Sequence, residues 1–195
     1  MPREPLDPDT IVSATEEVLR RHGPEKATVL DVARSLGVSH GSVYRHFPSK
    51  AALREAVIRG WLERSRQDFT ALLPDSGLPA AERLHSLLTT MFAAKWAKAQ
   101  EDPELFETFR VLATEHSAVS SAHVTALLTE IRAIVADGIT RGEFTGGDAE
   151  VRARAVFDAT VQFHSPIHAA EWRAPEIKAE SEAVIALILD GLRAR

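Results

Sequence analysis

Cysteine is absent from the chain of 195 residues. Its absence excludes disulfide bonds, thiol catalysis and thiolate metal sites, and it is compatible with a reducing cytosol. Long apolar runs are missing as well: none approaches the roughly 18 residues of a membrane span, and the first ten residues, MPREPLDPDT, have no apolar core. We therefore expect a soluble, cytoplasmic protein without a membrane partner.

The signatures of common enzyme classes are also missing. There is no glycine-rich phosphate loop, no Gly-x-Ser-x-Gly nucleophile elbow and no His-Glu-x-x-His zinc motif. The adjacent carboxylates Glu16 and Glu17 indicate a solvated helix surface rather than an acid–base pair. The sequence favours a protein that is not an enzyme and that requires no cofactor.

Helical periodicity is present along most of the chain. No segment shows the strict alternation of apolar and polar residues that is typical of a half-buried strand. We expect an all-α protein of about nine helices, with its clearest break at residues 73–79. Asp102 before Pro103 predicts a capping residue followed by proline at the first position of a helix.

Residues 28–50, TVLDVARSLGVSHGSVYRHFPSK, predict a helix-turn-helix. Thr28 is expected to cap the first helix, with Asp31 favourable to the helix dipole. Gly37 can supply the left-handed conformation that ends this helix, and Ser39 caps the second. The second helix, about His40 to Arg45 or His46, would turn polar side chains outward, where hydroxyl, imidazole and guanidinium groups can reach base edges or phosphates.

The charge distribution supports this interpretation. The net charge of the chain is -5, but residues 26–66 hold 8 Lys and Arg against 3 Asp and Glu, an excess of +5. Residues 67–195 hold 12 against 19, which gives -7. A local basic excess, doubled in a dimer, is sufficient for attraction to DNA.

The stretch LGVSHGSVYRHFPSKAAL resembles the helix-turn-helix signature of the TetR (tetracycline-repressor) family of bacterial transcription regulators. The resemblance implies a homodimer that represses transcription from a double-stranded DNA operator until a small-molecule effector enters its C-terminal domain. By position in the motif, it also implies DNA contacts from Thr28, Ser39, His40, Ser42, Tyr44, Arg45, His46 and Lys50. Tyr44 has the alternative of packing under the motif, and Ser39 that of capping alone.

Two domains follow from this resemblance. Residues 1–50 would form a three-helix DNA-binding domain, and residues 51–195 a larger helical domain for ligand binding and dimerisation, whose first helix links the two. The last two helices, about 148–170 and 176–194, are the expected dimer interface, because residues such as Ile185, Leu187 and Ile188 make the final helix apolar on more than one face. The alternative is that this surplus packs inside its own subunit.

The effector cavity is the least readable feature. Its expected lining is apolar and consists of Met91, Phe92, Phe109, Leu112, Leu127 and Phe163, although ordinary core packing explains the same residues. Pro166 should kink or loosen the helix around it. If the helix persists, His164 and His168 share one face at a metal-chelating spacing, and His123 could complete a divalent metal site; His116 and His123 form a second pair. A metal-binding regulator is therefore the alternative function, against histidines that only make hydrogen bonds.

Overall fold

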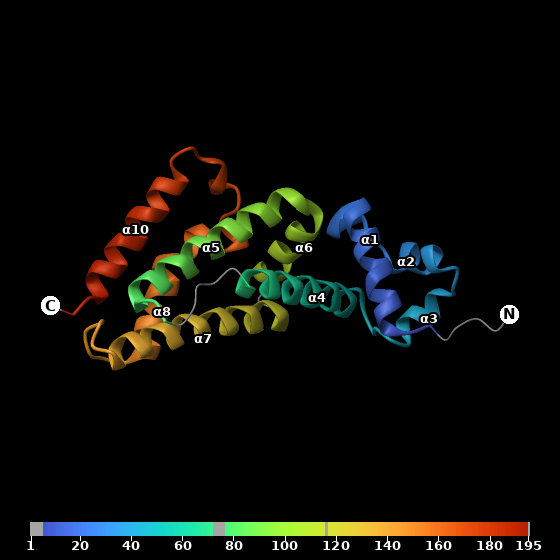
Figure 1. The fold of residues 1–195 in the computed structure, drawn as a ribbon. Helices are drawn as coiled ribbons and strands as arrows, with labels where there is room; N and C mark the ends of the chain where they lie inside the picture. The colour runs from blue at the N-terminus through green and yellow to red at the C-terminus, as the bar shows by residue number, and fades with distance from the viewer. Residues whose placement is uncertain (1–5, 72–76, 116, 195) are drawn as a thin grey trace. The chain divides into compact units, whose positions relative to one another are not determined.

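The computed structural model describes residues 6–71, 77–115 and 117–194 (Figure 1). These residues form ten α-helices and two short 3-10 helices, and their only β feature is an isolated bridge between Phe144 and Arg193. The all-α fold class is confirmed. The expected break at residues 73–79 lies largely outside the described residues, as does His116.

The chain packs as two compact units. Unit 1 comprises Met1–Arg64 and Lys98–Ser120, and unit 2 comprises Ser65–Ala97 and Ser121–Arg195. Three helices, α4 (Lys50–Ala71), α5 (Ala80–Glu101) and α7 (Ala118–Thr140), cross from one unit to the other. The packing units divide the chain at residues 64, 97 and 120, whereas the expected functional boundary lies at residue 50. That functional boundary remains a prediction.

Unit 1 contains α1 (Pro8–Lys26), α2 (Val29–Leu36), α3 (His40–Tyr44), the first part of α4, and α6 (Pro103–Thr114). Asp7 caps α1 by accepting a hydrogen bond of 2.8 Å from the amide of Thr10, and proline follows at the first helical position. Gly23, with φ of 72°, interrupts α1 near its end. Helix α1 packs against α2 and α6.

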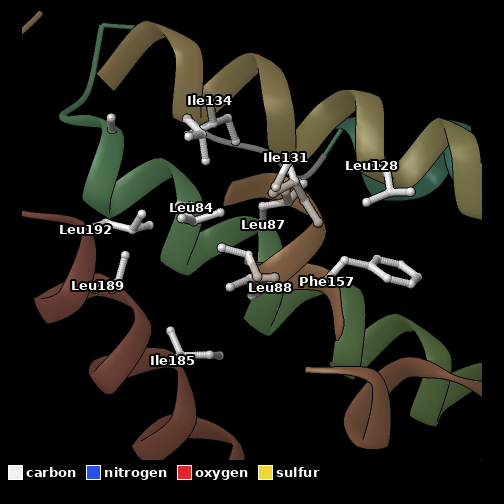
Figure 2. Packing of buried hydrophobic residues seen from close by; sticks show 14 of the residues in the cluster. Leu84, Leu87, Leu88, Leu128, Ile131, Ile134, Phe157, Ile185, Leu189 and Leu192 are labelled. Carbon is white, nitrogen blue, oxygen red and sulfur yellow. The ribbon is translucent and has the colours of Figure 1, made fainter. Parts of the chain in front are cut away.

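Unit 2 has an apolar core built from four helices (Figure 2). Helices α5 and α7 supply most of it, joined by α8 (Ala149–Ala159) and α10 (Ile177–Leu192). By length and composition alone α7 could cross a membrane. Its side chains at Leu128, Ile131 and Ile134 point into this core instead, as expected of a helix in a water-soluble domain.

The predicted helix over 148–170 is wrong as a continuous element. Asp148 caps α8, which ends at Ala159, and the short α9 (Val161–His164) follows. Ser165 is extended, with φ -79° and ψ 130°, because the residue before a proline is excluded from the helical region. Two 3-10 helices, η1 (Pro166–His168) and η2 (Glu171–Arg173), then lead toward α10. The predicted loosening at Pro166 is confirmed.

Candidate nucleic-acid interface

The first helix of the motif, α2, begins with a complete capping box. The hydroxyl of Thr28 accepts from the amide of Asp31 at 3.2 Å, and the Asp31 carboxylate accepts from the Thr28 amide at 3.1 Å and from its hydroxyl at 2.6 Å. These hydrogen bonds lower the pKa of Asp31, so the group is ionised at the positive end of the helix. Thr28 is exposed, and its hydroxyl already makes two hydrogen bonds to Asp31 within the cap.

The turn between α2 and α3 follows the residue types that were expected there. Gly37 adopts φ 64° and ψ 32°, and the amide of Val38 reaches the carbonyl of Ala33 at 3.0 Å. Ser39 then caps α3 by accepting from the amide of Ser42 at 3.2 Å. Val43 is fully buried beneath the turn, which fixes the orientation of α3 against α2.

The outer surface of α3 carries a connected set of polar side chains. The hydroxyls of Ser39 and Ser42 lie 2.8 Å apart, and Arg45 donates to the Ser42 hydroxyl at 3.0 Å. The rings of His40 and Tyr44 meet edge to face with centroids 4.6 Å apart. Tyr44 is 37% exposed, so its ring leans on His40 at the surface rather than packing under the motif.

Helix α4 begins beside this surface. Ser49 accepts from the amide of Ala52 at 3.0 Å, and Lys50 is the first helical residue. The Lys50 amino group donates to the backbone carbonyl of Glu25 at 3.3 Å, and partial burial, with the nearby Arg54, lowers its pKa. All eight residues of the predicted DNA-binding set therefore lie within one region of unit 1, and most are exposed. The sequence interpretation omitted Leu30, an apolar side chain 45% exposed on α2.

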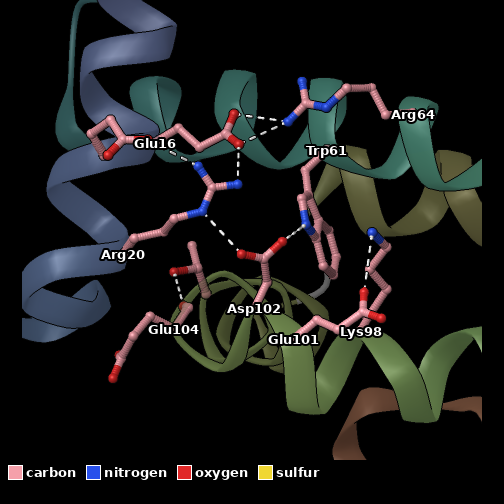
Figure 3. A network of polar contacts seen from close by, with 10 residues as sticks. Glu16, Arg20, Trp61, Arg64, Lys98, Glu101, Asp102 and Glu104 are labelled. Atoms are coloured by element: carbon pink, nitrogen blue, oxygen red, sulfur yellow. Dashed lines mark hydrogen bonds and ion pairs between the residues drawn. The ribbon is translucent and has the colours of Figure 1, made fainter.

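A network of polar side chains joins α1, α4 and the residue that precedes α6 (Figure 3). Glu16 accepts from Arg20 at 2.6 Å and from Arg64 at 2.8 Å. Asp102 accepts from Arg20 at 2.9 Å and from the Trp61 indole at 3.3 Å. Burial opposes ionisation of Asp102, but the hydrogen bonds from Arg20 and Trp61 hold its pKa below the usual range.

This network corrects two expectations. Glu16 is buried between two arginines, so it is not a solvated surface carboxylate. Asp102 precedes α6 with no side-chain cap hydrogen bond, because its carboxylate is directed to Arg20 and Trp61 instead. Apart from the pair Glu16 and Arg20, the contacts span 41 to 82 residues in sequence, a separation at which no local pattern indicates a partner.

The comparisons with known proteins agree with this geometry. The family profile described as bacterial regulatory proteins, tetR family, matches residues 11–57. A second profile, described as tetracyclin repressor-like, C-terminal domain, matches residues 80–185, which is more than half of the chain. The chain belongs to the TetR family.

Individual relatives are similar over limited parts of the sequence. The nucleoid occlusion factor SlmA of Aliivibrio fischeri is 41% identical over 58 residues, 29% of this chain and 30% of that protein. The transcriptional repressor KstR2 of Rhodococcus jostii is 33% identical over 72 residues, 37% of this chain and 35% of that protein. The chain thus aligns with about a third of the length of these relatives.

Solved structures share the fold over nearly the whole chain. The fatty acid degradation regulator FadR of Bacillus halodurans matches with a TM-score of 0.68 and 21% identity, covering 96% of this chain and 97% of the other. A TetR-family regulator of Pectobacterium atrosepticum matches with a TM-score of 0.71 and 16% identity, over 96% and 94%. At these identities the likeness establishes the arrangement of helices.

The predicted pocket residues are all buried, but they belong to different packing groups. Phe92 and Phe163 meet edge to face in unit 2, with ring centroids 6.1 Å apart, and Met91 and Leu127 belong to the core of the same unit. Phe109 packs instead on Trp61 and Phe106 in unit 1, where Leu112 is also buried. A shared cavity for all six residues remains a prediction.

The three predicted metal ligands do not come together as a metal site. Nε2 of His123 lies 2.6 Å from the amino group of Lys95, Nε2 of His164 lies 3.3 Å from the carbonyl of Phe157, and His168 contacts Glu171 at 3.0 Å. His164 and His168 are separated by the extended Ser165, so the helical spacing that suggested chelation is wrong. Among the described residues, no group of three or more suitable side chains is placed to hold a metal.

Proposed function

We propose that this protein is a ligand-responsive, dimeric transcriptional repressor that binds a palindromic operator and requires no cofactor. The observation that carries the proposal is the exposed face of α3, where Ser42, Tyr44 and Arg45 present hydrogen-bonding groups beside the basic start of α4. The backbone of α2 and α3 is fixed by caps, so this face is ordered before DNA arrives. A preformed surface avoids the entropy cost of ordering on binding.

Different residues of this face have different proposed roles. Arg45 can address a guanine edge through two parallel donors once its internal bond to Ser42 is exchanged for the base. Lys50 can contact phosphate, a role without sequence information. The excess positive charge of residues 26–66 attracts the duplex over a longer range, and this attraction weakens with salt as counterions are released.

The test is fluorescence anisotropy with labelled DNA from upstream of the protein's own gene, over roughly 50 to 200 mM salt. Affinity should fall steeply with salt. Arg45→Ala should cost roughly 1–3 kcal/mol and relax preference at one base pair, whereas Lys50→Ala should weaken all sequences alike. Arg173→Ala, at an exposed position of unit 2, is the matched control. A DNA affinity that changes neither with salt nor with Arg45→Ala and Lys50→Ala would contradict the proposal.

The dimer is proposed from the exposed apolar side chains of α8 and α10. Leu187 is 74% exposed and Val151 is 64% exposed, although both lie on helices whose other faces are buried in the core of unit 2. A partner that packs on α8 and α10 would remove both side chains from water. Two-fold pairing of this face would also match the symmetry of a palindrome.

Release of DNA is proposed to pass through the helices that cross between the units. Helix α5 continues directly into Asp102, which holds Arg20 of α1. An effector that displaces the end of α5 would therefore move Asp102, which follows α5 in the chain. Through its ion pair with Arg20, Asp102 would in turn move α1 and the helix-turn-helix packed on it. Because half-sites lie roughly 34 Å apart or a multiple of that, a shift of a few ångströms would prevent both recognition helices from binding together.

A further inference from the structure

Two cationic side chains lie one turn apart at the start of α4. Lys50 is the first residue of the helix, and Arg54 follows four residues later, which places both on the same face. Partial burial and the charge of Arg54 lower the pKa of Lys50, so the two groups interact electrostatically. Like charges at this spacing oppose helix formation, and the pair therefore costs free energy in the DNA-free protein.

Arg54 has one ion pair among the described residues, and it is a weak one. The Arg54 side chain is 17% exposed, and its Nε atom is buried without a hydrogen-bond acceptor in that part of the chain. Its partner is Glu115, the C-cap of α6, at an N–O distance of 3.8 Å and with a side chain 53% exposed. A long ion pair with an exposed partner offsets little of the cost of burying a guanidinium. The positive charge of Arg54 is therefore only partly neutralised.

Lys50 is oriented by the protein and still has donors for a phosphate group. Its ammonium carries three N–H donors, and one of them reaches the backbone carbonyl of Glu25 at 3.3 Å. A cavity of about 10 Å³, lined among others by Thr28, Lys50 and Arg54, has room for at most one water molecule. A phosphate group can thus reach Lys50 at the surface, whereas Arg54 behind it has no space to receive one.

We propose that Arg54 is a positioning residue for the phosphate contact of Lys50: its charge strengthens that contact without touching DNA, and Glu115 moderates the effect. This inference rests on the proposed function, since it concerns the same DNA-binding surface. Arg54 adds to the positive potential at the Lys50 ammonium, and its low exposure reduces the screening of this potential by salt. A phosphate group is attracted by both cations, so it offsets the repulsion between them in the free protein.

The second possibility is that Arg54 and Glu115 only hold α4 and α6 together. In that case, removal of either partner would lower the stability of unit 1, and neither removal would strengthen DNA binding. The proposed role predicts opposite signs: Arg54→Met weakens operator binding and Glu115→Gln strengthens it. The sign of the Glu115 effect therefore separates the two roles.

The experiment measures the affinity of full-length variants for upstream DNA by fluorescence anisotropy, over roughly 50 to 200 mM salt. Arg54→Met should weaken binding to all sequences roughly 3- to 10-fold, because a dimer presents two copies of the pair. Arg54→Lys keeps the charge and should stay close to the wild type. The matched control is Arg59→Met, which removes the same charge from an exposed position of α4 and should have a smaller effect.

The opposite effect is measured with Glu115→Gln, which should strengthen binding roughly 2- to 3-fold. Its matched control is Glu101→Gln, because Glu101 has an ion pair of similar length, 3.9 Å, but with Lys98. The control removes the same charge from unit 1 and should resemble the wild type. Thermal unfolding shows which variants are folded, and Glu115→Gln with its control decides the outcome if Arg54→Met is not.

A double-mutant cycle tests whether Arg54 acts through Lys50. In a Lys50→Ala background, Arg54→Met should weaken binding no more than Arg59→Met does. Side-chain NMR of the DNA-free protein gives a second readout: the pKa of Lys50 should rise in Arg54→Met, because a repelling charge is gone, and stay unchanged in Arg59→Met. A residue that only supports packing would leave this difference between the two arginines absent.

Opposite signs for Arg54→Met and Glu115→Gln, with an Arg54 effect that disappears without Lys50, support the proposal. The inference is overturned if Arg54→Met and Arg59→Met weaken binding equally, if Glu115→Gln fails to strengthen it beyond Glu101→Gln, or if the Arg54 effect persists unchanged in Lys50→Ala. Each of these results leaves the proposed function intact while the wild type binds operator in a salt-dependent way. A wild-type protein that binds no operator would remove both.

Discussion

The helix-turn-helix region and the C-terminal helices differ in how closely their structure follows from neighbouring residues. In residues 28–50, each turn is determined within four residues: Thr28 with Asp31, Gly37 with Ala33, and Ser39 with Ser42. In unit 2, the important contacts join residues such as Lys95 and His123, which are 28 apart. Local capping rules therefore predict the helix-turn-helix, and they say little about the interior of unit 2.

The same difference separates the correct predictions from the wrong ones. Gly37 and Ser39 have the conformations that their residue types predict. The continuous helix over 148–170 is wrong: α8 already ends at Ala159, and the extended Ser165 before Pro166 then ends the short α9. Asp102 was expected to cap α6, and its carboxylate instead binds a distant arginine. No local pattern indicates the contact between Lys95 and His123, because a lysine in an amphipathic helix is usually a solvated side chain.

The proposed dimer face of α8 and α10 offers the largest expected effect. Leu187→Glu places charge on a side chain that is exposed in the subunit, so the fold should survive while the dimer is lost, at a cost of several kcal/mol. Light scattering should show a monomer that no longer binds the operator. Leu78→Glu, on another exposed leucine, is the control. Ile188→Glu is less informative, because Ile188 packs against the core of its own subunit. A dimeric Leu187→Glu would place the interface elsewhere.

The buried histidine gives the next largest effect, and it is specific to unit 2. The pKa of His164 is lowered from 6.5 to about 4, so the unfolded chain binds its proton first as the pH falls. Neutral His164 therefore contributes to the free energy of unfolding, and this contribution is fully present above pH 6.5. It is lost as the pH falls from about 6.5 to 4, a decrease of roughly 3 kcal/mol. Urea unfolding at a series of pH values should show this loss. The loss of stability at low pH should be smaller in His164→Gln and unchanged in His22→Gln, a variant of an exposed histidine. Equal pH profiles of stability for the two variants would contradict the role given to His164.

The ion network of unit 1 should give a moderate effect. Asp102→Ala removes the acceptor of Arg20 and Trp61 and should lower the free energy of unfolding by roughly 1–3 kcal/mol. Asp190→Ala removes an exposed pair with Arg193 and should cost less than about 1 kcal/mol. If Asp102 couples α6 to the reading helix, its loss should also reduce effector-induced release of DNA. Equal unfolding midpoints in denaturant for the two variants would show that the network is not important for stability.

The smallest effect distinguishes capping from DNA contact within unit 1. Thr28→Ala and Asp7→Ala each remove a helix cap, and each should cost about 1 kcal/mol in thermal or denaturant unfolding. Only Thr28 belongs to the predicted DNA-binding set. Under conditions where both variants are folded, operator affinity should fall for Thr28→Ala and remain for Asp7→Ala. Matching affinities would leave Thr28 as a cap alone.

We propose that two copies of α3 bind the two halves of one palindrome. Hydroxyl-radical footprinting of the wild-type protein on its own upstream region measures this directly. We predict two protected patches related by two-fold symmetry, with centres roughly 34 Å apart or a multiple of that, and both patches lost together in Arg45→Ala. A single unsymmetrical patch, or protection that persists unchanged in Arg45→Ala, would contradict the account.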